Sequence, residues 1–198
     1  SDSSGNNYHG LSVTGASSTG TAYDISSTPA TGKEDYSVTG YDGTVDGALY
    51  MQDSQWINLN SHLSALTTIL SNAFTISVWC QFKENDGDEE ETIFSLWEND
   101  STEIWIYKEH KTSPGTVTFE MNGQTVESTT NFGIDKPWYH LAFTFNNSGT
   151  IRIFVNGILE SSQYSSSIAS VDYSGATFAA IGESPHPEEN LSLIHISE

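Results

Sequence analysis

Residues 138–160, WYHLAFTFNNSGTIRIFVNGILE, decide the fold class of this chain. Two runs rich in β-branched and aromatic residues, 138–145 and 151–155, flank the Asn-Asn-Ser-Gly segment 146–149. Asn156 and Gly157 close the second run with another turn signal. Apolar runs that alternate with such turn residues are typical of β-strands, so the stretch predicts a β-hairpin followed by a further turn.

The length of the first turn sets the register of this hairpin. If 146–149 form a four-residue loop, Phe145 lies opposite Thr150. One side of the pair then carries His140, Ala142, Ile153 and Val155, and the other carries Leu141, Phe143 and Phe154. Both sides are partly apolar, which indicates strands in the middle of a sheet.

The hairpin and four other stretches resemble a known family. The pattern Trp-Tyr-His-Leu-Ala-x-Thr, turn, Ile-x-Ile-x-Val-Asn-Gly resembles the laminin G-like jelly-roll domains of the concanavalin A-like lectin/glucanase superfamily. Residues 2–10 look like the family's opening Asp-x-Ser-Gly-Asn-x-x-His-Gly loop, and 47–51, 74–79 and 181–184 look like three later motifs in the family's order. The resemblance implies an all-β fold, an antiparallel β-sandwich of the jelly-roll type.

Two terminal motifs of that family have no counterpart in this sequence. The family's strand before the opening loop is absent, and residues 191–198, LSLIHISE, do not match its closing strand. We therefore expect a jelly roll that lacks its first and last strands, which leaves an unpaired edge in one sheet. The predicted domain is 1–190, and 191–198 is predicted to be a non-native or divergent tail.

The composition of the chain limits the classes of partner that it can bind. The 198 residues suit one β-sandwich domain. With 6 Lys+Arg against 26 Asp+Glu, the formal charge of -20 argues against nucleic acid and anionic membranes as partners. No apolar stretch approaches the roughly 20 residues of a membrane span, so we expect no membrane insertion. The single cysteine, Cys80, allows no internal disulfide.

Periodicity predicts several further elements. Phe74, Ile76, Val78, Cys80 and Phe82 alternate with polar residues and Trp79, so this set is expected to face the core and Cys80 to be a small buried hydrophobe. Residues 62–70 have helical spacing. Strands are predicted at 48–51, 56–59, 93–97, 104–107, 117–121, 124–127 and 177–181, with an Asn122–Gly123 turn, and a Ser-rich connection is predicted at 161–170.

One acidic run invites a catalytic interpretation. Residues 98–103 spell Glu-x-Asp-x-x-Glu, and related jelly-roll glucanases use such a run for a retaining carboxylate pair. Here Asn99, Asp100 and Ser101 are turn formers, which favours a connecting loop between Trp97 and Ile104. A β-glucanase-like glycosidase using Glu98 and Glu103 is therefore kept as the alternative.

A structural Ca²⁺ near the opening loop is implied by the family resemblance. Asp2 and Asn6 offer the hard oxygen ligands that calcium takes. An Asx-turn without a metal explains the same residues equally well.

Sugar recognition requires aromatic faces beside polar groups, because a pyranose has apolar C–H faces and hydroxyl edges. Trp105 and Tyr107 alternate with Ile104 and Ile106, so if the isoleucines are inside, the two rings form an exposed platform. Trp79 is a third candidate. The alternative is that these rings pack against other parts of the chain.

These observations lead to one functional expectation. We expect a non-catalytic binding or adhesion module that recognises glycans or another cell-surface ligand. It is expected to belong to a larger protein that is secreted, lies on a cell surface or is part of a viral particle. Trp105, Tyr107 and Trp79 are the predicted carbohydrate-binding residues, and Asp2 and Asn6 the predicted metal ligands. A ligand-free spacer domain is the second alternative, since this architecture hosts many functions.

Overall fold

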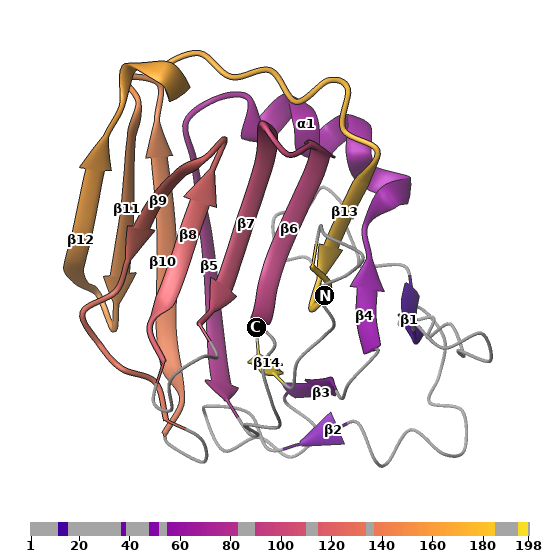
Figure 1. Ribbon diagram of the computed structural model, residues 1–198. Coiled ribbons are helices and arrows are strands. Elements are labelled where there is room, and N and C mark those ends of the chain that lie inside the picture. Colours follow the sequence, from indigo (N-terminus) through magenta and orange to yellow (C-terminus); the bar gives the residue numbers. More distant parts are fainter. Residues whose placement is uncertain are drawn as a thin grey trace.

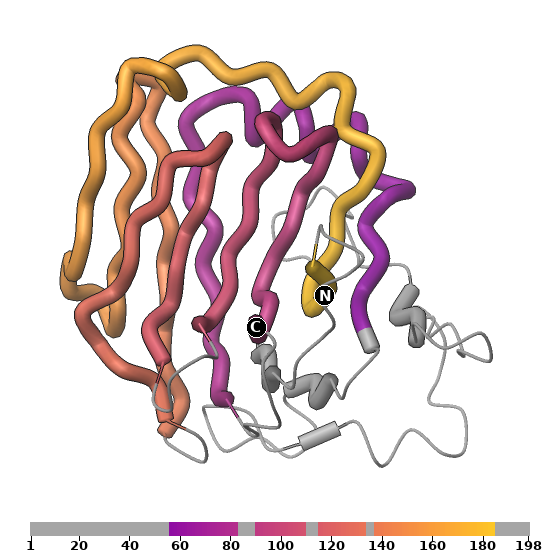
Figure 2. Tube along the Cα trace, viewed as in Figure 1, coloured from indigo at the N-terminus to yellow at the C-terminus, as the bar shows by residue number. Residues whose placement is uncertain are grey.

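The computed structural model describes residues 12–15, 37–38, 48–51, 55–82, 90–109, 115–133, 137–184 and 194–197 (Figure 2). Side chains are described for 56–82, 90–109, 115–133 and 137–184. Strands dominate these ranges, and they form two seven-stranded sheets, here called sheet A and sheet B. Figure 1 shows the sheets as two layers with the helix α1 (Leu63–Leu70) at one end. The predicted all-β antiparallel jelly-roll sandwich is confirmed.

Sheet A has the strand order β1-β4-β13-β6-β7-β8-β9. Its strands are β1 (Ser12–Gly15), β4 (Gln55–Asn58), β13 (Phe178–Ile181), β6 (Glu91–Asn99), β7 (Thr102–Lys108), β8 (Val117–Met121) and β9 (Gln124–Glu127). Asn122 and Gly123 join β8 to β9 with positive φ at both residues, 50° and 71°. Two successive positive φ values define the type I′ turn that the Asn-Gly pair predicts.

Sheet B has the strand order β12-β11-β10-β5-β14-β3-β2. Its strands are β12 (Ile158–Tyr164), β11 (Thr150–Val155), β10 (Tyr139–Asn146), β5 (Phe74–Phe82), β14 (Ile194–Ser197), β3 (Ala48–Met51) and β2 (Ser37–Val38). The predicted Ser-rich connection is wrong in its first part, because 161–164 belong to β12. The Asn156–Gly157 turn, with φ of 49° and 80°, reverses the chain directly into that strand.

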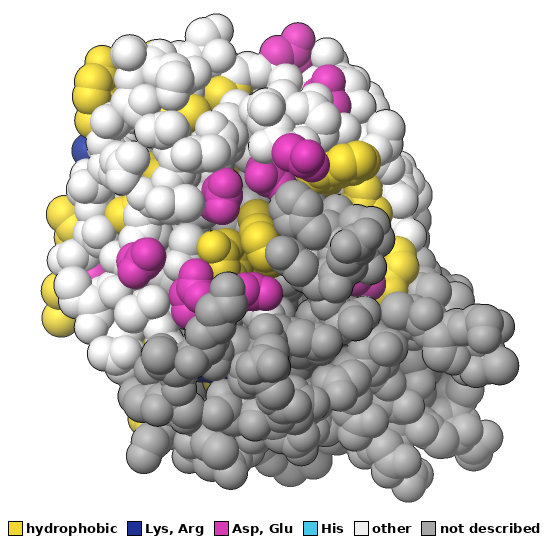
Figure 3. Space-filling model, in the orientation of Figure 1, with side chains coloured by type: hydrophobic (Ala, Val, Ile, Leu, Met, Phe, Trp, Pro, Cys, Tyr) yellow, Lys and Arg dark blue, Asp and Glu magenta, His cyan; other side chains and the backbone are white. Residues whose placement is uncertain are grey.

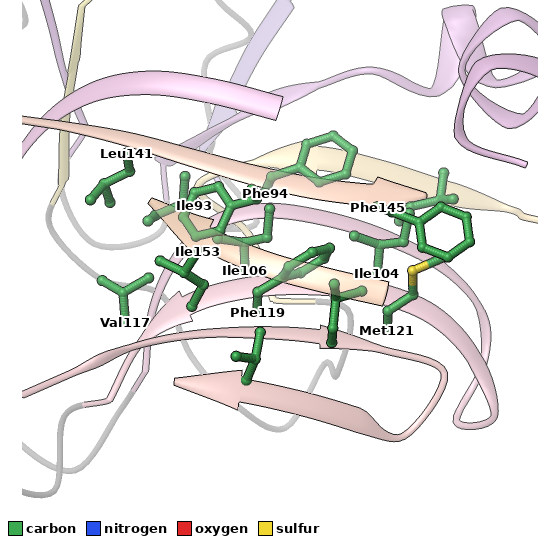
Figure 4. Close-up of a cluster of buried hydrophobic side chains, with 14 of the residues drawn as sticks. Ile93, Phe94, Ile104, Ile106, Val117, Phe119, Met121, Leu141, Phe145 and Ile153 are labelled. Atoms are coloured by element: carbon green, nitrogen blue, oxygen red, sulfur yellow. The ribbon is translucent and has the colours of Figure 1, made fainter. Parts of the chain in front are cut away.

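The core lies between the sheets, where side chains of alternate residues meet. Figure 4 shows Ile104, Ile106, Phe119 and Met121 of sheet A beside Ile153 and Phe145 of sheet B. The β5 set faces this core as predicted: Phe74, Cys80 and Phe82 are buried, and Ile76 and Val78 pack against the cluster. Burial, together with the charge of Glu91, raises the pKa of the Cys80 thiol, so the residue behaves as a buried hydrophobe.

The predicted register of the β10–β11 hairpin is wrong by one residue. Asn146 pairs with Thr150, which leaves a three-residue loop, 147–149. The Oδ1 of Asn146 accepts the backbone N–H groups of Ser148 (3.1 Å) and Thr150 (2.9 Å). Gly149, at φ 85°, donates its N–H to the backbone oxygen of Asn146 at 2.9 Å. Three-residue hairpin loops need a residue in the left-handed backbone conformation at this position, and glycine adopts that conformation readily.

Because side chains alternate along a strand, this shift turns each face of β11 to the opposite face of β10. Leu141, Phe143, Phe145, Ile151, Ile153 and Val155 are buried in the core. His140, Ala142, Thr144, Arg152 and Phe154 are all partly exposed and lie on the outer face of sheet B. Ile153 and Val155 therefore share a side with Leu141 and Phe143, where the prediction placed Phe154, and Phe154 shares a side with His140.

Sheet B has a strand where the sequence predicted none. Residues 194–197 form β14, which pairs with β3 on one side and with β5 on the other. Its side chains and residues 191–193 lie outside the described residues. The non-native or divergent origin of 191–198, the absence of the family's opening strand and the boundary at 190 stay predictions.

One ion pair is buried inside the sandwich. Lys108 Nζ lies 3.1 Å from Glu91 Oε2, and the two side chains are only 1% and 2% exposed. The ammonium group also lies over the ring of Phe82, 5.4 Å from its centroid. Within the described residues Lys108 Nζ makes no hydrogen bond, so Glu91 and the ring supply its stabilisation.

Candidate functional site

The structure corrects the predicted platform of Trp105 and Tyr107. Ile104 and Ile106 face the core as expected, so both rings lie on the outer face of sheet A. They are nevertheless only 6% and 8% exposed. The rings stack on each other with centroids 4.0 Å apart, and the indole N–H of Trp105 donates to Thr92 Oγ1 at 3.0 Å. A ring buried to this extent offers no face to a sugar.

The surroundings of Tyr107 are acidic as well as buried. Burial, followed by the charges of Glu109, Glu120 and Glu90, raises the pKa of the Tyr107 hydroxyl. Burial also raises the pKa of Glu183 to about 7, and its backbone oxygen accepts the hydroxyl of Ser95 in β6 at 2.7 Å. Figure 3 shows acidic side chains gathered on the side of the molecule that faces the viewer in Figure 1.

Trp79, the third predicted ring, lies on the outer face of sheet B and is partly exposed. Its indole packs against the imidazole of His140, with ring centroids 5.2 Å apart and planes tilted by 53°. The β5–β10 pairing brings these two residues directly opposite each other. The backbone of His140 in turn pairs with Asn156 at the end of β11, whose Oδ1 accepts the His140 N–H at 2.9 Å.

We call the surrounding surface the Trp79 face. It consists of the outward side chains of four neighbouring strands: Thr75, Ser77 and Trp79 of β5, His140, Ala142 and Thr144 of β10, Arg152 and Phe154 of β11, and Leu159, Ser162 and Tyr164 of β12. Leu159 and Tyr164 are 50% and 66% exposed. Rings, hydroxyl groups and one guanidinium therefore share one accessible surface.

Charge separates the two outer faces. Among the described residues, the Trp79 face holds no Asp or Glu, whereas the outer face of sheet A holds Glu103, Glu120 and Glu127. Glu160, in β12, turns away from the Trp79 face and accepts the backbone N–H groups of Thr129 and Thr130, both at 2.9 Å. The Trp79 face is thus neutral to basic in a chain of formal charge -20.

One end of the Trp79 face is hollowed. Arg152 lines this shallow depression together with Thr75, Thr144 and Asn146. The sequence prediction missed Arg152, His140 and Phe154 as site residues because the register of the hairpin was off by one. Asn146 and Gly149 carried the missing signal, since Asn accepts hydrogen bonds from its own turn and Gly favours the left-handed position.

The predicted connection between Trp97 and Ile104 is present but shorter than expected: it is a tight turn in which Asn99 Oδ1 accepts the backbone N–H of Ser101 at 3.0 Å. β6 runs to Asn99 and β7 begins at Thr102, so Glu98 and Glu103 lie in a tight hairpin with Trp97 opposite Glu103. The register shifts at Glu98, and the carboxylate of this residue lies against Gly175. Glu103 is only 3% exposed, which is less access than a carboxylate acting on a polysaccharide needs.

Asp2 and Asn6 lie outside the described residues, so the predicted calcium site stays a prediction. In the part of the chain that the structure describes, no group of three or more His, Cys, Asp or Glu side chains is arranged to hold a metal ion. The described helices also include none with the length and apolar character that a membrane crossing requires.

Comparison with known proteins agrees with this architecture. The sequence model of a family described as "Concanavalin A-like lectin/glucanases superfamily" matches residues 51–192, more than half of the chain. No curated protein sequence matches.

Solved structures similar to this one include the CBM40 of the Ruminococcus gnavus IT-sialidase, bound to α2,3-sialyllactose, with a TM-score of 0.56, 12% identity, and coverage of 76% of this chain and 89% of that one. The leech intramolecular trans-sialidase gives a TM-score of 0.54 at 14% identity, with 76% of this chain and 25% of that chain covered. The receptor binding domain of botulinum neurotoxin C/D mosaic serotype gives 0.53 at 15% identity, with 95% and 46% covered. At these identities the likeness shows a shared fold.

Proposed function

Because the chain belongs to the concanavalin A-like lectin/glucanase superfamily, we propose that it is a non-catalytic glycan-binding module whose binding surface is the Trp79 face. The observation that carries the proposal is the Trp79–His140 ring pair, 5.2 Å between centroids and partly exposed, on a surface free of carboxylates among the described residues. A sugar ring can stack its C–H face on the indole, because such contacts remove apolar surface from water.

The neighbours of the ring pair supply the polar half of sugar recognition. Ser77 lies two residues before Trp79 on the same side of β5 and is exposed, and the side chain of Asn156 lies beside His140 across the β10–β11 pair. Hydroxyl and amide groups both donate and accept hydrogen bonds, as the hydroxyl edge of a sugar requires. Ala142, between His140 and Thr144, leaves room for a ring to approach the sheet.

The comparisons support the class of ligand that we propose. The R. gnavus module is bound to sialyllactose and the leech enzyme to 2,7-anhydro-Neu5Ac, so proteins that share this fold include ones that hold sugars. The botulinum domain is described as receptor binding. A glycan, or a glycan on a cell-surface receptor, is therefore the ligand class we propose, and an extracellular setting within a larger protein is proposed with it.

A glycan array followed by isothermal titration calorimetry tests the proposal. Trp79→Ala is expected to weaken binding at least 10-fold, because stacking on an aromatic ring and burial of its surface contribute roughly 1.5–3 kcal/mol. Trp56→Ala is the matched control. Trp56 also belongs to an aromatic pair, 5.7 Å from Phe178, but on the outer face of sheet A. Equal loss in both variants, or binding retained in Trp79→Ala, would contradict the assignment of the face.

The same experiment addresses the other expectations. Arrays run with Ca²⁺ and with a chelator test the proposed ion at Asp2 and Asn6. A protein silent in both conditions would favour the spacer, and reducing-sugar release from β-glucans that disappears in Glu98→Gln would favour the glycosidase.

A further inference from the structure

Arg152 is a positively charged residue on the surface of a strongly acidic protein. It is the single arginine of the sequence, in a chain with 26 acidic residues, and it lies on the surface that holds no described carboxylate. Its cross-strand neighbours are Thr144 on β10 and Ser162 on β12, with Thr75 one strand further. Within the described residues Arg152 forms no ion pair. The cross-strand neighbours of Arg152 thus all carry hydroxyl groups.

The hollow at this end of the Trp79 face suits an anion. Its polar lining is Thr75, Thr144, Asn146 and Arg152, and Ala73, Phe74 and Phe145 complete it. A guanidinium presents a planar fork of donors that matches the two oxygens of a carboxylate, and the hydroxyl groups can satisfy the remaining lone pairs. Phe154, the next outward residue of β11, places a ring beside the guanidinium, against which the sugar that carries the carboxylate can lie.

We propose that Arg152 is a carboxylate subsite and that the preferred ligands are glycans with an acidic sugar, a uronate or a sialate. This inference rests on the proposed function and extends it. From strand spacing, Arg152 and Trp79 are about 17 Å apart, since residues advance about 3.4 Å along a strand and strands lie about 4.8 Å apart. A short oligosaccharide can therefore stack on Trp79 and place its carboxylate at Arg152.

The net charge of -20 does not oppose this assignment. At physiological salt, interactions between exposed charges are screened over about 8 Å. The carboxylates of the sheet A face lie on the far side of two sheets that are stacked about 10 Å apart. Among the described residues, Arg152 is the Lys or Arg side chain of the Trp79 face, and it supplies the attraction felt by an anion that has docked there.

Titration calorimetry with two matched probe pairs tests the inference: 3′-sialyllactose against lactose for a sialate, and trigalacturonate against its methyl ester for a uronate. The acidic member of at least one pair is expected to bind about 10- to 100-fold more tightly than its neutral partner, as a charge-assisted hydrogen-bonded pair allows. Arg152→Gln is expected to abolish that preference. Arg152→Lys is expected to restore it only in part, because an ammonium lacks the planar fork.

Thr125→Glu is the matched charge control. It lowers the net charge by one, as Arg152→Gln does, but at an exposed position in β9, on the outer face of sheet A. Thermal unfolding of each variant verifies that it is folded. Equal affinity for acidic and neutral probes, a preference that survives Arg152→Gln, or equal weakening in Thr125→Glu would overturn the inference. Neutral-only binding that Trp79→Ala removes would overturn it and leave the proposed function standing, whereas no binding of any glycan would overturn both.

Discussion

The buried pair of Lys108 and Glu91 allows a sharp prediction about stability. Both side chains are at most 2% exposed and the Nζ–Oε2 distance is 3.1 Å, so neither charge is solvated if its partner is removed. Lys108→Met keeps a similar chain length and leaves the Glu91 carboxylate in the core, close enough to Cys80 for its charge to raise the pKa of that thiol. Breaking a buried pair in this way costs about 3–5 kcal/mol.

Removing both charges together is expected to have a far smaller effect. In Glu91→Leu/Lys108→Met the core holds two apolar side chains, and replacements of this kind are often neutral or stabilising by about 1–4 kcal/mol. The two single variants and the double variant form a cycle in which the coupling free energy isolates the pair. Its expected value is several kcal/mol, because each single change removes the opposite charge that lies 3.1 Å from a buried charge.

Urea unfolding and thermal unfolding at neutral pH measure these quantities. A loss of about 3–5 kcal/mol lowers the midpoint of thermal unfolding by roughly 6–20 °C in a chain of this size. Single variants that lose less than about 1 kcal/mol would refute the reasoning, because they would mean that water reaches the pair. A double variant as unstable as the singles would show that Lys108 and Glu91 stabilise the sandwich through packing and not through charge.

Two further predictions concern local structure. Gly149→Ala is expected to destabilise the protein by more than about 2 kcal/mol, because a Cβ there would overlap the backbone oxygen of Ser165 and would also be strained at a φ of 85°. Gly157→Ala has a similar φ of 80° but open space around it, so it is expected to destabilise the protein by only about 1 kcal/mol. Urea unfolding compares them, and equal losses would be contrary to the close contact. At Glu160, burial acts to raise the pKa, but hydrogen bonds from Thr130 and Thr129 outweigh it and lower the pKa of the carboxyl. Glu160→Gln is therefore expected to be less stable than the wild type at pH values above the ordinary carboxyl pKa of about 4.3. The difference in stability is expected to vanish as the pH falls below the lowered pKa of Glu160 in the folded protein. A loss of stability in thermal unfolding that does not change with pH would argue against this role.

Local patterns in the sequence predict the strands because they depend on residues close together. The alternation from Phe74 to Phe82 predicts β5 and its buried side, and the Asn122–Gly123 pair predicts both the turn and its left-handed backbone. The helical spacing of 62–70 predicts α1, which begins at Leu63. In each case the deciding interaction spans only a few residues, so propensity and periodicity carry it.

Exposure is harder to predict, since it depends on which other parts of the chain cover a face. The alternation of Trp105 with Ile104 places the indole on the outer face of sheet A, as observed, but only the folded chain reveals that the ring is 6% exposed. The register of a hairpin has a similar uncertainty. The segment 146–149 permits loops of three or four residues, and the hydrogen bonds of Asn146 and Gly149 select three.

That single residue of register also determines which side chains form the proposed binding surface. With a four-residue loop, Ile153 and Val155 would share a face with His140, and the surface beside Trp79 would be an apolar patch better suited to the core. With the observed loop, Arg152 and Phe154 lie on that surface with His140 and Thr144. A formal charge of -20 argues against an anionic ligand only when charge is averaged over the whole surface. Recognition acts within about one screening length. Among the described residues, the outer face of sheet A carries carboxylates and the Trp79 face of sheet B carries the arginine and none, so the local charge reverses that conclusion.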